Sequence, residues 1–202
     1  MPTERIVTNA PISNPEHPIW DQIDLVLERL AAAGIRLELD EHPPILGFEL
    51  LAFGDHRSGT WFLIWEDYRA KVKFVEITSP DVERLAVMRA AIHACMDVPS
   101  RAQLLARARR GRSNPDALMR IVYAAGDAPD PDTFALVTAA LSHQDAYMRD
   151  IATYGVSILG WPGFEDSLRT MLERESTPSV ADHMRQTIAT LGRSGRPLYP
   201  II

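Results

Sequence analysis

This sequence contains few of the residues that give direct evidence of function. Its one cysteine, Cys95, excludes a disulfide within the chain and any cysteine-rich zinc site. The longest uncharged stretch, residues 151–164, is shorter than the roughly 20 apolar residues that a membrane-spanning helix needs. Residues 1–17 lack the apolar core of a signal peptide, so we expect a cytoplasmic protein without a membrane partner.

The chain also lacks the basic excess that is typical of nucleic-acid-binding proteins. Its 21 lysines and arginines are outnumbered by 27 aspartates and glutamates, and the formal net charge is -6. Residues 1–100 hold 9 basic and 16 acidic residues, whereas residues 101–202 hold 12 and 11. The acidic N-terminal half suits a basic protein partner.

No catalytic motif stands out. There is no glycine-rich phosphate loop, no nucleophile elbow, and no pair of histidines that flank a glutamate on a helix. Cys95 lies on the apolar stripe of a predicted helix, so we interpret it as an inert buried thiol rather than a nucleophile. We predict that the protein is not an enzyme and has no cofactor, no metal site and no catalytic residue.

The N-terminal part has the pattern of a small antiparallel sheet between two helices. Residues 1–17 are expected to form an arm or loop, and residues 60–66 are apolar on both alternating faces, as in a central strand covered on both sides. The predicted elements are a helix over residues 18–33, strands over 35–39, 46–53, 60–66 and 71–77, and a helix over 79–96.

Four helices are predicted between residues 131 and 192, over 131–141, 145–159, 162–174 and 178–191. The second and fourth share an apolar pattern that repeats after 32 residues. Met148, Ala152, Val156, Leu159 and Gly160 correspond to Val180, Met184, Ile188, Leu191 and Gly192. Such a period indicates stacked helical pairs.

Helix starts are marked by a capping residue directly before a proline. The cap accepts a hydrogen bond from a free backbone N–H, and proline in the first turn has no N–H to leave unpaired. The four pairs are Ser79-Pro80, Asn114-Pro115, Asp130-Pro131 and Thr177-Pro178.

The segment from Asp145 to Ala152, followed by Leu159-Gly160-Trp161-Pro162, resembles the inner helix of a HEAT repeat. The resemblance implies an all-α array of helical hairpins in which Asp145 and Arg149 brace neighbouring repeats. We therefore predict an α+β protein. A four-stranded antiparallel meander with flanking helices fills residues 1–97, a basic helix or linker fills 98–113, and a HEAT-like array with a C-terminal tail fills 114–202.

The expected function is that of a non-enzymatic protein–protein interaction module, such as a bacterial immunity-type inhibitor of a basic partner. Tyr68, in a turn, is a candidate partner contact, and Arg149, Tyr154 and Arg185 are candidates on the helices.

The alternative is a nucleic-acid-binding or cofactor-attachment protein that uses the cluster of arginines between Arg101 and Arg112. Its phosphate contacts would be Arg107, Arg109, Arg110 and Arg112. We favour the reading of this cluster as cations near the C-terminus of a helix, and we regard nucleic acid as the less favoured partner.

Overall fold

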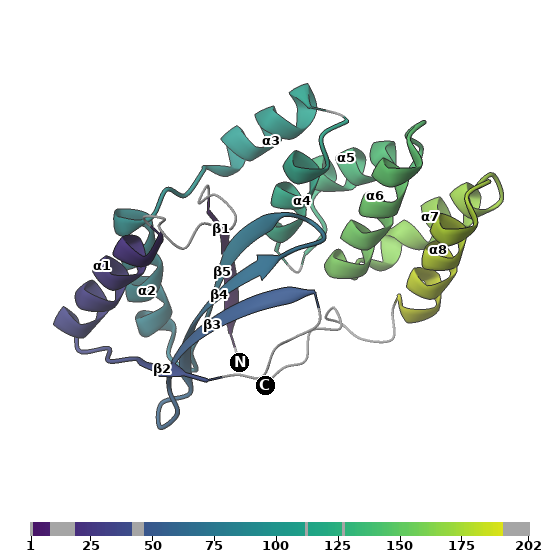
Figure 1. Cartoon of the computed structure of the whole chain (residues 1–202). Coiled ribbons are helices and arrows are strands. Elements are labelled where there is room, and N and C mark those ends of the chain that lie inside the picture. Colours follow the sequence, from purple (N-terminus) through teal and green to yellow (C-terminus); the bar gives the residue numbers. More distant parts are fainter. Residues whose placement is uncertain (1, 9–18, 42–46, 112, 127, 192–202) are drawn as a thin grey trace. The chain divides into compact units, whose positions relative to one another are not determined.

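A computed structural model describes residues 2–8, 19–41, 47–111, 113–126 and 128–191. The chain separates into two compact units, Met1–Pro99 and Ser100–Ile202. The first unit holds an antiparallel sheet and two helices and the second is helical, so the fold class is α+β (Figure 1).

The sheet has five strands rather than the four predicted. They are β1 (Thr3–Val7), β2 (Glu38–Asp40), β3 (Phe48–Asp55), β4 (Thr60–Asp67) and β5 (Val72–Thr78), in the spatial order β1-β5-β4-β3-β2. The strand that the sequence analysis missed is β1, which lies within residues expected to form an arm or loop. It pairs antiparallel with β5, with Thr3 opposite Thr78, and Arg5 Nε lies 3.0 Å from Glu76 Oε2.

One face of the sheet is covered by α1 (Ile19–Ala32) and α2 (Val82–Cys95), which form its hydrophobic core (Figure 1). Because successive side chains of a strand point to opposite faces, Phe62 and Ile64 of β4 lie in this core. On the opposite face Leu63 and Trp65 are also buried. The prediction that this strand is buried on both faces is therefore confirmed.

The start of α2 differs from the prediction. Its N-cap is Asp81, whose side chain accepts hydrogen bonds from the backbone N–H groups of Glu83 and Arg84. Ser79, the predicted cap, instead accepts the Asp81 N–H at 3.1 Å and lies 3.1 Å from Thr60 Oγ1 on β4. The helix begins later than expected because the hydroxyl of Ser79 is used at the end of the sheet.

The second unit consists of successive helices. They are α3 (Arg101–Arg110), α4 (Pro115–Tyr123), α5 (Pro131–Leu141), α6 (Ala146–Leu159), a 3-10 turn at Pro162–Phe164, α7 (Glu165–Leu172) and α8 (Pro178–Thr190). Asn114 and Asp130 cap α4 and α5 as predicted, whereas Thr177 makes no side-chain cap bond at α8. The helix predicted over residues 145–159 corresponds to α6, whose N-cap is Asp145.

Three helical pairs are formed by α3 with α4, α5 with α6, and α7 with α8 (Figure 1). The second members of the pairs, α4, α6 and α8, also pack side by side in a row, with α6 in the middle. Gly155 allows α4 and α6 to approach closely, since a Cβ atom there would lie 3.2 Å from a methyl group of Val122. At the other end of α6, Gly160 adopts a left-handed conformation that ends the helix.

Candidate functional site

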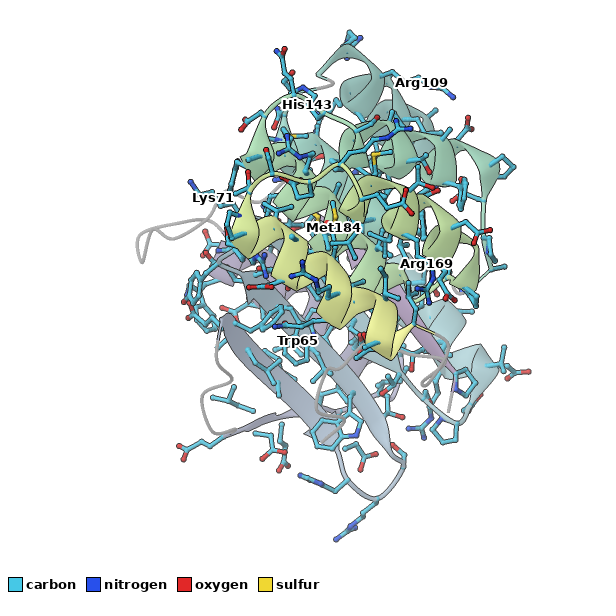
Figure 2. The ribbon with its side chains drawn as sticks, turned by 90° about the vertical axis from the view of Figure 1, so that its right-hand side faces the viewer. Trp65, Lys71, Arg109, His143, Arg169 and Met184 are labelled. Carbon is cyan, nitrogen blue, oxygen red and sulfur yellow. The ribbon has the colours of Figure 1, made fainter. Side chains whose placement is uncertain are left out.

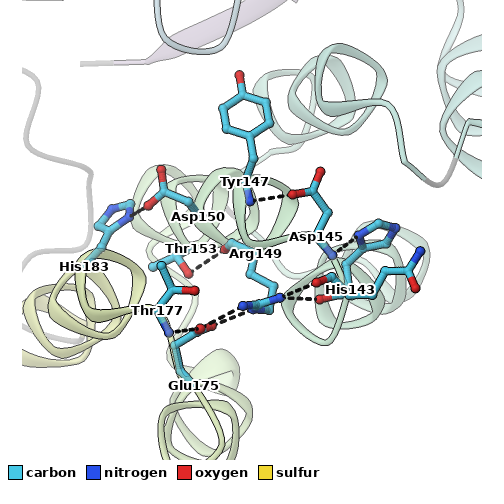
Figure 3. Close-up of polar contacts among 10 residues, drawn as sticks. His143, Asp145, Tyr147, Arg149, Asp150, Thr153, Glu175, Thr177 and His183 are labelled. Atoms are coloured by element: carbon cyan, nitrogen blue, oxygen red, sulfur yellow. Dashed lines mark hydrogen bonds and ion pairs between the residues drawn. The ribbon is translucent and has the colours of Figure 1, made fainter.

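Arg149 of α6 forms a polar junction between two connecting segments of the helical unit (Figure 3). Its guanidinium donates to both carboxylate oxygens of Glu175, with distances of 2.6 Å from Nε and 2.8 Å from Nη2. Nη1 donates to the backbone carbonyls of His143 and Gln144 at 2.8 and 2.9 Å. Arg149 therefore joins α6 to the turn that precedes it and to the segment between α7 and α8.

The carboxylate of Glu175 is held in its ionised form at this junction. Its side chain is 1% exposed. The hydrogen bonds from Arg149, assisted by that of the Thr177 backbone N–H at 2.8 Å, lower its pKa from the ordinary 4.5 to about 2. An arginine that is used in this way is better placed to brace the helices than to bind a partner.

The carboxylate that pairs with Arg149 is not the one expected, which was Asp145. Asp145 caps α6, with its carboxylate accepting the Tyr147 N–H at 3.0 Å, and the carboxylate partner of Arg149 is Glu175. Glu175 could not be identified from the sequence, because it lies 26 positions from Arg149 and an acid in a connecting segment is usually solvated. No local spacing signals this pair.

We expect the Glu175 ion pair to make stability depend on acid pH. Because the folded state lowers this pKa, the stabilisation is complete above about pH 4.5 and is lost as the pH falls toward about 2. The lost free energy of unfolding should be about 3 kcal/mol, since one pKa unit corresponds to about 1.4 kcal/mol.

Urea unfolding of the wild type and of Glu175→Gln between pH 7 and 2.5 measures how the free energy of unfolding depends on this ion pair. The variant should be less stable at pH 7, and the difference from wild type should shrink as the pH falls. A difference that is independent of pH would contradict the assignment.

Tyr147, Asp150 and Tyr154 lie along one face of α6. Tyr147 is 49% exposed, whereas Asp150 and Tyr154 are partly buried at three- and four-residue spacing along the same helix face. Asp150 Oδ1 lies 2.8 Å from Nδ1 of His183, which links α6 to α8 (Figure 3). The predicted contact Tyr154 thus shares its face with Tyr147, a residue that the sequence analysis missed although it precedes Tyr154 by two helical turns.

The remaining predicted partner contacts lie at separate places. Arg185 is an exposed residue of α8 and donates to Asp182 at 2.5 Å, one turn away on the same helix. Tyr68 belongs to the sheet unit, where its side chain is 50% exposed and its hydroxyl donates to Glu49 at 2.6 Å. That hydrogen bond is the main cause that raises the pKa of Tyr68 to about 12.

The predicted phosphate contacts do not lie together in the structure. Arg107 and Arg110 line a pocket beside α4, whereas Arg109 is directed elsewhere and donates to Asp132 at 2.5 Å. Arg109 lies at the surface of the helical unit (Figure 2). Arg112 lies outside the described residues.

The groups usually associated with catalysis or metal binding are dispersed. Among the described residues, no three histidine, cysteine, aspartate or glutamate side chains are grouped in a way that could hold a metal ion. Cys95 is a partly buried free thiol that packs against the core of the sheet unit. Within the same described residues, no helix combines the length and the apolar character needed to cross a bilayer.

Comparison with known proteins adds no relative from which a role could be transferred. No family model matches the chain, and no curated protein or solved structure shows significant similarity to it. The functional argument therefore depends on the residues and contacts described above.

Proposed function

We propose that the chain is a non-enzymatic protein–protein interaction module whose helical unit is a short HEAT-like array. The packing of α4, α6 and α8 in one row, each with a partner helix, supports this proposal, because such rows present extended surfaces for binding. The specific role that suits the charge of the chain is that of an immunity-type inhibitor of a basic protein.

The observation that carries the proposal is the setting of Tyr147 at the start of α6. Asp145 and Asp150 flank this exposed ring on two sides (Figure 3). Tyrosine is among the residues that contribute most to interface energies, and flanking carboxylates attract a basic partner. In the described part of the helical unit, Tyr147 is the one large apolar side chain that is exposed.

Affinity capture from a lysate of the native organism, with mass spectrometry of the retained material, tests the proposal. We expect a single stoichiometric protein with a basic surface. Tyr147→Ala should then weaken binding by about 30-fold, the effect of losing a contact worth about 2 kcal/mol. The change should appear in calorimetric titration with the purified partner.

Arg169→Ala is the matched control for this variant. Arg169 is also exposed on the helical unit, but it lies on α7, where it pairs with Glu165 one turn away (Figure 2). Its replacement should leave partner affinity unchanged within about twofold. Retention of nucleic acid or a small molecule without any protein, or equal losses in both variants, would contradict the proposed interaction surface.

A further inference from the structure

The two helices that cover the sheet carry apolar side chains on their outer surface as well as in the core. Both helices direct their buried residues toward the sheet, so their exposed residues face away from it (Figure 1). Seven large hydrophobic side chains are exposed in the described part of the chain, and four of them lie on α1 and α2. The four are Trp20, Leu25, Val82 and Val87, with exposures of 43%, 52%, 69% and 39%.

An apolar row runs along the exposed side of α2. It consists of Val82, Ala86, Ala90 and Ala94, which follow one another at intervals of four residues. Val87 borders the row. A helix that is apolar on its inner and its outer side is typical of one that is covered on both sides. The sheet covers the inner side of α2, so the outer side is the one that a partner can cover.

Acidic side chains border this apolar surface. Three lie on the exposed side of α1 and one in the first turn of α2, namely Asp21, Asp24, Glu28 and Glu83. None of the four forms an ion pair with another described residue, and both arginines of α2, Arg84 and Arg89, are paired with acids outside the helix. Four acids against Arg29, the one basic residue of α1, leave this surface negatively charged.

The combination of apolar and acidic side chains determines which partner fits. In a symmetric dimer the same patch of both copies would meet, so the acids of α1 would face one another, and like charges across an interface are unfavourable. A helix with one apolar face and basic residues beside it would cover the row on α2 and pair with the acids of α1. Around the axis of α1, these acids lie between Trp20 and Leu25, so the charged and the apolar contacts are adjacent.

We propose that the outer face of α2, together with the acidic face of α1, binds an amphipathic helix of another protein that carries lysine or arginine beside its apolar face. The 14 residues of α2 extend over about 21 Å, which a partner helix of similar length would match. This surface belongs to the sheet unit and includes no residue of the surface around Tyr147. The two proposals can therefore fail separately.

The probe is a synthetic peptide of about 18 residues, made of leucine and lysine so that the leucines form one face of a helix. Fluorescence anisotropy at low ionic strength measures its affinity for the full chain. We expect one peptide per chain with a Kd below about 100 μM. Ala90→Gln should weaken binding by about tenfold, because it places a polar side chain in the middle of the apolar row. Ala90 is exposed and glutamine favours helices, so the melting temperature should not change.

Ala139→Gln is the matched control, since Ala139 is an exposed alanine on α5 of the helical unit. It should change peptide affinity by less than about twofold, as should Tyr147→Ala. Asp24→Asn combined with Glu28→Gln tests the charge. This variant should weaken binding by about fivefold at low salt and have little effect at about 1 M salt, where the Debye length is about 3 Å.

Four results would overturn the proposal. The first is the absence of peptide binding up to about 1 mM. The second is an equal loss of affinity in Ala90→Gln and Ala139→Gln, which would place the peptide elsewhere or show that it binds without a defined site. The third is equally tight binding of a peptide with glutamate in place of lysine. The fourth is a dimer in sedimentation equilibrium that Ala90→Gln dissociates, because a second copy of the chain would then cover this surface.

Discussion

Replacing Arg149 with methionine should lower the free energy of unfolding of the helical unit by about 3 kcal/mol or more. The substitution leaves the carboxylate of Glu175, which is 1% exposed, without its positive partner. Removal of one member of a buried ion pair typically costs about 3–5 kcal/mol, because the remaining charge is uncompensated. For a unit of about 100 residues, each kcal/mol lowers the melting temperature by roughly 4–8 °C.

Thermal unfolding followed by circular dichroism measures this effect, and two further variants identify its cause. Arg169→Met breaks an exposed ion pair between an arginine and a glutamate, and should cost less than about 0.5 kcal/mol. Arg149→Met combined with Glu175→Gln removes both charges of the junction and should recover part of the lost stability. If the single and double variants were equally unstable, lost packing rather than an uncompensated charge would explain the effect.

Phe62→Ala should destabilise the sheet unit by about 3–5 kcal/mol. Phe62 lies on β4, the middle strand of the sheet, is fully buried, and contributes to the core formed with α1 and α2. Removing a ring from such a place loses the transfer free energy of the ring and leaves a cavity that the surrounding structure fills only in part.

The matched control is Leu25→Ala on α1, because this residue is 52% exposed although its helix covers the same core. It should cost less than about 1 kcal/mol. Chemical denaturation followed by tryptophan fluorescence is a suitable measurement, since Trp61 and Trp65 flank Phe62 on β4. Equal losses for Phe62→Ala and Leu25→Ala would mean that β4 does not form the centre of the core.

Helix positions could be predicted from the sequence because their determinants are local. Asn114-Pro115 and Asp130-Pro131 each combine a side-chain acceptor with a residue that fits the first turn, and both helices begin there. At Ser79 the same pattern was misleading. The hydroxyl of Ser79 is used near Thr60, and a capping pattern carries no information about such a competing partner.

The strand β1 could not be predicted because its stability comes from a distant part of the chain. Residues 3–7 are short and only partly apolar, and their pairing with β5 joins positions about 70 residues apart. The candidate sites were incomplete for the same reason. The carboxylate partner of Arg149 is Glu175, which lies 26 positions along the chain in a connecting segment.

The position of β1 also has a consequence for the order of events in folding. The hairpins β3–β4 and β4–β5 join neighbouring segments, so their loops close early at a small entropic cost. Thr3 and Thr78 are far apart in the sequence, so their pairing closes a long loop. The strand β1 can therefore add only after β5 has been synthesised and paired. Until then the edge of β5 can pair with strands of other chains, so the addition of β1 protects this edge from aggregation.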